Sequence, residues 1–136
     1  MKKSKKILIG VVLLISFVIF QIYMTTSPNN IIENIRESYK GVVISRKQIA
    51  QRESHLTRIF SKINNKTTED IFRSELDSII DVGDSVIKPA NENYIYLIKP
   101  NGKRKKYIYT FISKDTREDF RWPKEWKGRW TNDTIK

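Results

Sequence analysis

An almost continuous apolar segment near the N-terminus constrains this chain more than any other feature. Residues 7–24 read ILIGVVLLISFVIFQIYM and contain no charged side chain. As an α-helix with a rise of about 1.5 Å per residue, the segment is roughly 27 Å long, and the hydrocarbon core of a bilayer is about 30 Å thick. The sequence therefore predicts a helix that spans a membrane.

The residues that flank the segment predict its orientation and its fate. Four lysines precede it: Lys2, Lys3, Lys5 and Lys6. Such a basic cap stays in the cytoplasm. A signal peptide has the same basic and apolar regions, but residues 24–28, MTTSP, lack the A-x-A pattern of a cleavage site. We therefore expect a cytoplasmic cap at 1–6, a retained anchor at 7–24 and one periplasmic or extracellular domain at 25–136. Secretion after cleavage is the alternative.

Composition bounds the chemistry of the rest of the chain. About 110 residues follow the apolar segment, enough for one small domain. The chain has no cysteine, which excludes disulfides, zinc–thiolate sites, thiol nucleophiles and lipid attachment to cysteine. The formal net charge is +11, and +7 remains without the four lysines of the cap. This charge predicts anionic neighbours, with solubility as the simpler explanation.

Hydrophobic periodicity and turn residues predict an α+β domain. One helix is expected over 28–40, with Ser27 as its N-cap and Gly41 as its terminator. A second is expected over 67–81, with strand as the alternative around 70–73. The expected strands cover residues 41–47, 55–63, 86–88, 94–98 and 104–112. Five to six strands with one or two helices predict a curled sheet, or a barrel of the SH3-like or oligonucleotide/oligosaccharide-binding (OB) kind.

The strongest strand signal belongs to a hairpin with Asn101-Gly102 at its tip. We expect an aromatic ladder across it, with Tyr94 and Tyr96 facing the aromatic residues of the partner strand: Tyr107, Tyr109 and Phe111. The tip is basic: Lys99, Lys103, Arg104, Lys105 and Lys106. Cations beside aromatic rings predict an anionic ligand, a lipid surface or nucleic acid. Protection of an exposed strand edge is the simpler interpretation.

The C-terminal tail, residues 113–136, carries tryptophan at every fourth position: Trp122, Trp126 and Trp130. On a helix these residues would form one stripe among basic side chains, a pattern typical of membrane interfaces and glycan stacking. Pro123 and Gly128 argue against a continuous helix. A tail that packs its tryptophans onto the domain core is the alternative.

The remaining motifs predict no catalytic or metal centre. Gly83-Asp84-Ser85 resembles the nucleophile motif of GDSL-type hydrolases, but the only histidine, His55, lies upstream on an expected strand. A tight turn, with Gly83 at positive φ and Asp84 as a cap, explains the motif more simply. One histidine without cysteine cannot form a ligand cluster, and the isolated glycines form no phosphate-binding loop.

The segments 39–44 (YKGVVI), 82–88 (VGDSVIK), 94–98 (YIYLI) and 101–103 (NGK) resemble a family of short, uncharacterised bacterial envelope proteins with a GVV strand and a VGDS turn-strand. The resemblance covers about the middle half of the chain. It implies an exported or anchored domain and supplies no known activity. Some relatives carry a lipid-modified cysteine, which this chain lacks.

These features predict a membrane-anchored envelope protein that serves as a non-catalytic binding or assembly module without a cofactor. Its predicted contact surface combines the hairpin and the tail: Tyr94, Tyr96, Lys103, Arg104, Lys105, Lys106, Trp122, Trp126 and Trp130. The expected partners are the membrane and an envelope protein, a glycan or an anionic lipid. The alternatives are a small hydrolase that uses Ser85 and a nucleic-acid binder, which the compartment disfavours.

Overall fold

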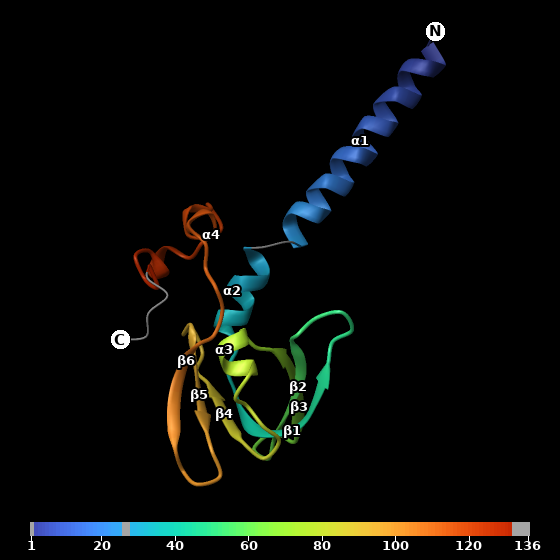
Figure 1. The fold of residues 1–136 in the computed structure, drawn as a ribbon. Helices are drawn as coiled ribbons and strands as arrows, with labels where there is room; N and C mark the ends of the chain where they lie inside the picture. The colour runs from blue at the N-terminus through green and yellow to red at the C-terminus, as the bar shows by residue number, and fades with distance from the viewer. Residues whose placement is uncertain (1, 26–27, 132–136) are drawn as a thin grey trace.

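A long helix projects from a small folded domain. The computed structural model describes residues 2–25 and 28–131. Helix α1 (Lys2–Thr25) extends away from the domain, and its C-terminal end lies near α2 and α4 (Figure 1). Every side chain from Lys5 to Tyr23 is exposed, and this stretch is long and apolar enough to cross a membrane. A signal sequence has the same properties.

The domain is built on one six-stranded antiparallel sheet that does not close into a barrel. Its strands are β1 (Tyr39–Gln48), β2 (His55–Ser61), β3 (Lys66–Ile71), β4 (Ser85–Lys88), β5 (Tyr94–Ile98) and β6 (Arg104–Ile108). Their order in the sheet is β3-β2-β1-β4-β5-β6, so two meanders meet where β1 pairs with β4. The predicted α+β class is confirmed, with an open sheet in place of the barrel alternative.

The main core lies between the sheet and the short helix α3 (Ser74–Asp77). Five strands contribute buried residues to this face: Val43, Ile59, Val86, Ile95, Leu97 and Tyr107. Phe72, Leu76 and Ile80 cover them from the α3 segment. The period of two on the strands and of four on the helical segment explains why these apolar residues meet.

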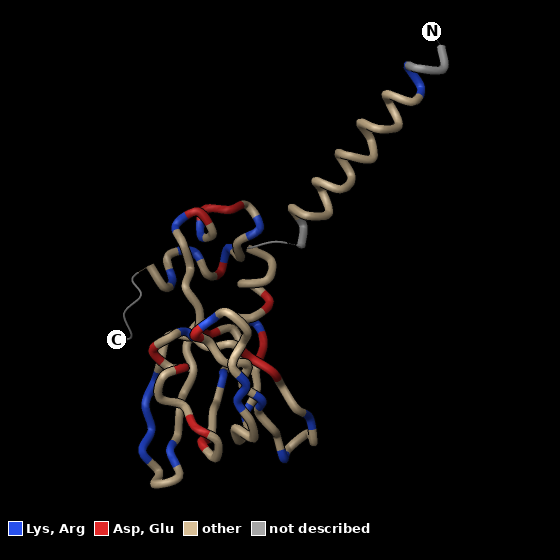
Figure 2. The backbone as a smooth tube through the Cα atoms, turned by 45° about the vertical axis from the view of Figure 1, so that its right-hand side comes forward, with Lys and Arg blue, Asp and Glu red and all other residues tan. Residues whose placement is uncertain are grey.

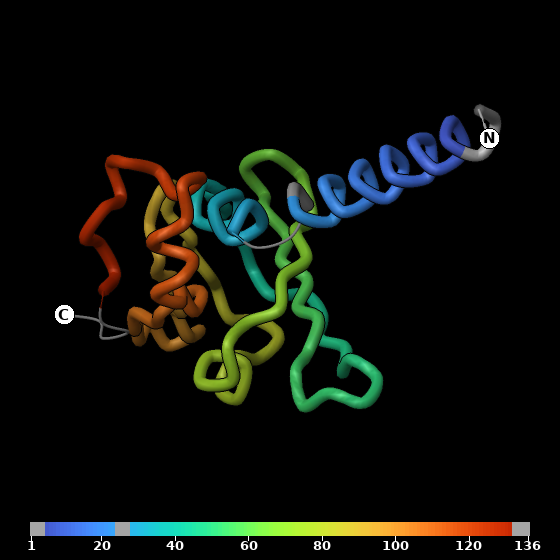
Figure 3. Tube along the Cα trace, turned by 90° about the horizontal axis from the view of Figure 1, so that it is seen from above, coloured from blue at the N-terminus to red at the C-terminus, as the bar shows by residue number. Residues whose placement is uncertain are grey.

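A second apolar cluster holds the end of the domain that lies nearest to α1. It joins Ile32 and Ile35 of α2 (Asn29–Arg36) to Ile112, which precedes the C-terminal tail, and to Trp122 and Trp126 of the tail. The tail forms α4 (Lys114–Glu118) and the 3-10 helix η1 (Lys124–Trp126). Figures 1 and 3 both show the tail beside α2.

The predicted helix over 28–40 is too long at its C-terminal end. Strand β1 starts at Tyr39, so Gly41 is a strand residue and not a helix terminator. A Cβ atom at Gly41 would lie 2.4 Å from the carbonyl oxygen of Phe60 on β2. Glycine is therefore required here for the close approach of two backbones. Ser27, the expected N-cap, lies outside the described residues.

The predicted helix over 67–81 is also wrong in its first part. Residues 66–71 form the edge strand β3, in which Thr67 and Thr68 pair with Phe60 and Ile59 of β2. Threonine is β-branched and favours this conformation. The helical spacing of the apolar residues that follow is real, but it produces a single helical turn, α3.

One carboxylate connects the two outer parts of the sheet. Asp70 on β3 accepts hydrogen bonds from the Tyr39 hydroxyl at 2.5 Å and from the Tyr109 hydroxyl at 2.6 Å. Tyr39 begins β1, and Tyr109 follows the opposite edge strand, β6. The other oxygen of Asp70 accepts from the backbone N–H of Ile71 at 2.8 Å. In a closed barrel the two edge strands would be joined by backbone hydrogen bonds. In this open sheet, side-chain hydrogen bonds to Asp70 connect the two edges instead.

Replacement of this carboxylate should weaken the domain. Asp70→Asn keeps the shape of the side chain but replaces a charged acceptor of two phenol hydrogens with a neutral one. Hydrogen bonds to charged groups contribute roughly 1.5–3 kcal/mol each, so we expect the free energy of unfolding to fall by about 2 kcal/mol in urea titrations. Glu69→Gln, on the same strand, removes only the exposed Arg58–Glu69 ion pair. It should cost less than about 1 kcal/mol, and equal losses would contradict the assignment.

Candidate functional site

The register of the β5–β6 hairpin assigns its side chains to two faces. Tyr96 lies opposite Lys106, and Ile95 lies opposite Tyr107. Because directly opposed residues share a face, Tyr107 is buried with Ile95, whereas Tyr94 and Tyr96 point to the outer face. The expected aromatic ladder across the hairpin is therefore wrong.

On the outer face Tyr94 and Tyr96 each make a cation–π contact with a basic side chain. The Arg104 guanidinium carbon lies 3.7 Å from the centroid of the Tyr96 ring, and the Lys106 Nζ lies 4.1 Å from that of Tyr94. The two rings meet edge to face at 5.3 Å. Cation–π contacts at exposed sites contribute roughly 0.5–1 kcal/mol each. They order two long basic side chains into a row, which we call the outer basic row: Tyr94, Tyr96, Arg104 and Lys106.

The remaining basic residues of the hairpin divide into two groups. Lys99 is engaged within the domain, because its ammonium donates to Asp84 at 2.7 Å, to Asp81 at 3.1 Å and to the Ile79 carbonyl at 2.6 Å. Its hydrogen bond to Asp84 is the main cause of its raised pKa. Lys103 and Lys105 are exposed and border a hollow of about 340 Å³ that Lys99 also lines.

Within the described part of the chain, none of the four consecutive basic residues 103–106 has a carboxylate partner. Figure 2 shows this basic stretch on the hairpin at the end of the domain farthest from α1. Uncompensated charge concentrated in this way creates a positive potential that extends into solvent. The geometry suits an anionic partner that approaches from the side away from α1.

The three tryptophans do not join this surface. Trp122 and Trp126 are 6% and 2% exposed and pack against α2 at the other end of the domain. Trp130 is partly buried, and its ring centroid lies 5.4 Å from that of Trp126. The structure therefore separates the two halves of the predicted contact surface and leaves the tail little indole surface for stacking on a ligand.

His55 and Ser85, the residues considered for catalysis, have different partners. The His55 Nδ1 lies 2.9 Å from one carboxylate oxygen of Asp77, and Arg46 donates to the other at 2.6 Å. Ser85 lies on β4, opposite Val42 and Ile98. No hydrogen bond joins Ser85 to His55 among the described residues.

The turn that precedes Ser85 has the expected geometry. Gly83 adopts a φ of 96°, and the carboxylate of Asp84 accepts from the backbone N–H of Asp81 at 2.8 Å. The interpretation of Gly83-Asp84 as a structural turn is confirmed. Within residues 2–25 and 28–131 there is no group of acidic and histidine side chains that could hold a metal ion.

Lys88 is a buried ionisable residue that the sequence did not reveal. It is 1% exposed, and its ammonium donates to the carbonyls of Ile35 at 3.0 Å, Glu37 at 3.1 Å and Pro89 at 2.7 Å. Burial lowers the pKa of Lys88 to about 8, against the opposing effect of the Asp70 charge. All three ammonium hydrogens are used, so Lys88 ties the C-terminal end of α2 to the sheet and has none left for a substrate.

Comparison with known proteins found no matching family model, no similar curated protein and no similar solved structure. The resemblance to short envelope proteins stays a prediction.

The pH dependence of stability tests the burial of Lys88. Because its pKa is about 8 when folded against 10.5 ordinarily, the unfolded chain binds more protons between these values, and the free energy of unfolding rises with pH there. The full shift corresponds to about 3 kcal/mol. Lys88→Met should be less stable near neutral pH, since three carbonyls lose their donor, and should lack this rise in urea titrations. A rise of the same size in both proteins would contradict the assignment.

The two buried tyrosines limit the useful pH range. Burial, reinforced by the Asp70 charge, raises the pKa of Tyr39 and of Tyr109 above the ordinary value of 10. The stability that these phenols provide is present below pH 10 and is lost as the pH rises further. The comparison between wild type and Lys88→Met therefore belongs between about pH 8 and 10, where Lys88 titrates alone among the three.

Proposed function

We propose that this chain is a single-pass membrane protein that holds a small non-catalytic binding domain outside the membrane, and that the hairpin of this domain binds a linear anionic polymer. The observation that carries the proposal is the outer basic row. It is an ordered set of cations without carboxylate partners, and it lies at the end of the domain farthest from the apolar helix (Figures 1 and 2).

The exposure of α1 supports retention in a membrane. The apolar side chains from Ile7 to Tyr23 are all exposed, and none of them is buried by the domain. Exposed apolar surface of this size is favourable only in lipid or in contact with another apolar surface. The lysines before the helix favour a cytoplasmic N-terminus.

A contact between the domain and the helix supports an uncleaved anchor. Arg121 donates to the Tyr23 carbonyl at 2.9 Å, and its guanidinium carbon lies 4.3 Å from the centroid of the Tyr23 ring. Signal cleavage after this segment would remove Tyr23 and leave Arg121 with its other partner, Asp119. The contact gives the retained helix a structural role at the base of the domain.

The geometry of the hairpin favours a linear polyanion over a small ligand. Residues two apart on a strand lie on the same face, roughly 7 Å from each other. Arg104 and Lys106 therefore form a row of charges along the edge strand β6, and Lys103 and Lys105 extend it on the other face. Repeated anionic groups along a polymer can contact such a row at several points, each of them weak and salt-dependent.

Binding measurements on matched variants test the proposal. The full chain in phosphatidylcholine nanodiscs would be titrated with a phosphodiester-linked glycerol polymer, with polygalacturonate and with single-stranded DNA. Of the first two polymers, the one that binds more tightly should bind the Arg104→Gln/Lys106→Gln variant at least about tenfold more weakly, because both removed charges belong to the proposed binding surface. Lys62→Gln/Lys66→Gln, an equal charge change at the β2–β3 turn, should change it less than about twofold.

Two further results decide against the proposal. Equal losses in both double variants would mean that net charge alone attracts the polymers and that the row has only an edge-protecting role. A clear preference for DNA, together with a C-terminal reporter that works only in the cytoplasm, would favour the nucleic-acid alternative and reverse the proposed topology.

A further inference from the structure

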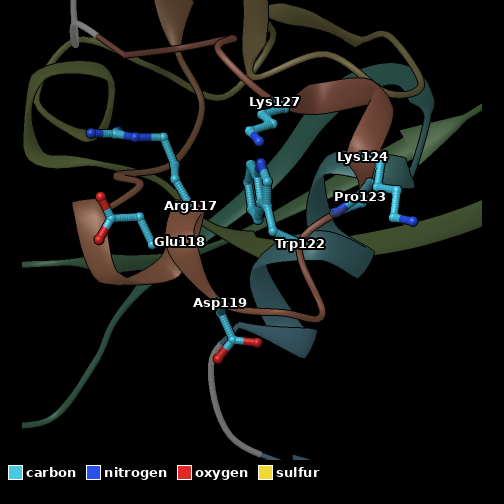
Figure 4. A pocket seen from close by; sticks show the side chains of 7 residues that line it. All are labelled: Arg117, Glu118, Asp119, Trp122, Pro123, Lys124 and Lys127. Carbon is cyan, nitrogen blue, oxygen red and sulfur yellow. The ribbon is translucent and has the colours of Figure 1, made fainter.

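The end of the domain nearest to α1 contains a pocket of about 320 Å³ that the tail forms between α4 and η1. Its lining includes three cationic side chains and one indole: Arg117, Lys124, Lys127 and Trp122 (Figure 4). The volume lies at the lower end of the range for small-molecule sites, about 300–1,000 Å³.

The indole of Trp122 has an unused donor. Trp122 is 6% exposed, and its Nε1 is buried without a hydrogen-bond partner among the described residues. Figure 4 shows this indole edge-on in the pocket, with its nitrogen at the end nearest the Lys127 ammonium. A buried N–H without an acceptor is unfavourable, and an anion placed between it and the ammonium would satisfy both groups.

The carboxylates of the pocket do not cancel its positive charge. Asp119 is bound by Arg121 at 2.9 and 3.0 Å, which lowers the pKa of Asp119 and keeps it ionised within a neutral pair. Glu118 faces Lys114 at 3.7 Å. Lys124 and Lys127 have no carboxylate partner in the described part of the chain. The local excess charge is therefore positive.

The pocket is fixed relative to the apolar helix through two contacts. Asp119, which lines the pocket, binds Arg121, and Arg121 in turn contacts the carbonyl and the ring of Tyr23. Tyr23 is the last residue of the stretch that can cross a membrane. The headgroup layer outside the hydrocarbon is roughly 6 Å thick on each side, so the pocket would lie at the level of lipid phosphates.

Phe120 strengthens this placement. Its side chain is 82% exposed, although its two neighbours in sequence, Asp119 and Arg121, form an ion pair. An exposed aromatic side chain next to basic residues is typical of segments that lie in the interface of a membrane. The tail would thus contact the bilayer through Phe120 and hold a headgroup in the adjacent pocket.

From this geometry we infer that the pocket between α4 and η1 binds the phosphate of an anionic phospholipid headgroup, with the Trp122 N–H and the Lys127 ammonium as donors and Lys124 as a further positive charge at the rim. The inference rests on the membrane placement of α1 proposed above, and it is independent of polymer binding at the hairpin. Its consequence is a domain held at the bilayer surface in one orientation, with the hairpin directed outward.

The indole N–H resonances of the full chain in nanodiscs test the inference. The protein would be ¹⁵N-labelled and studied in phosphatidylcholine alone and in phosphatidylcholine mixed with phosphatidylglycerol, with the Trp122 signal assigned through its loss in Trp122→Phe. We expect phosphatidylglycerol to shift the Trp122 indole proton downfield, as a new hydrogen bond to phosphate requires. The signals of Trp126 and Trp130 should move less.

Matched variants assign the shift to the pocket. Lys124→Gln/Lys127→Gln should abolish it, whereas Lys103→Gln/Lys105→Gln, an equal charge change on the hairpin, should leave it intact. An unchanged Trp122 signal, or an equal shift in both variants, would overturn the inference. A full shift produced by inorganic phosphate in phosphatidylcholine nanodiscs would overturn the lipid as the source. Loss of the protein from both nanodisc types would instead contradict the membrane placement of α1.

Discussion

Two phenol groups that share one carboxylate hold this domain in its shape. Through Tyr39 and Tyr109, Asp70 joins the edge strand β3 to the start of β1 and to the chain that leaves β6. Among the described strands, backbone pairing joins the two meanders only between β1 and β4, over four residue pairs. Backbone pairing in an open sheet leaves both edges free, so the closure of this core depends on side-chain hydrogen bonds.

Lys88 extends the same principle to the helical end of the domain. Its ammonium connects β4 to the carbonyls at the end of α2, where the helix dipole favours a cation. Helix α2 and the tryptophan tail form a second cluster above this connection. The domain therefore has two ends with different chemistry. One carries the tail, the pocket and the contact with α1, and the other carries the basic hairpin.

The sequence predicts the features that depend on strong local patterns. The apolar helix, the Gly83 turn and the hairpin strands all follow from runs or turn residues that leave few choices, whereas the choice between a sheet and a barrel stayed open. The register of the hairpin did not follow, because its loop is longer than a two-residue Asn-Gly turn. The Lys99 N–H donates to the Lys103 carbonyl and encloses a loop of three residues, 100–102. A one-residue change in register exchanges the two faces of the hairpin.

Other features carry no signal within a single sequence. A glycine after an amphipathic segment is typical of a helix end, so the sequence alone does not place Gly41 in a strand. The close approach of the Phe60 backbone explains why this strand position is a glycine. Strand β3 is polar because it is an edge, so its pattern does not distinguish it from the start of a helix. The burial of Lys88 and the separation of the tryptophans from the hairpin arise from tertiary packing that no local pattern records.

The two ends of the domain should lie at different depths relative to the bilayer, and depth-dependent quenching measures this difference. The chain has no cysteine, so Asn101→Cys at the hairpin tip and Phe120→Cys beside α1 each give one labelling site. With the full chain in vesicles, a fluorophore at position 120 should be quenched by lipids that carry a nitroxide at the headgroup. A fluorophore at position 101 should respond only to an aqueous quencher. Equal aqueous quenching at both positions, or headgroup quenching at position 101, would contradict the account.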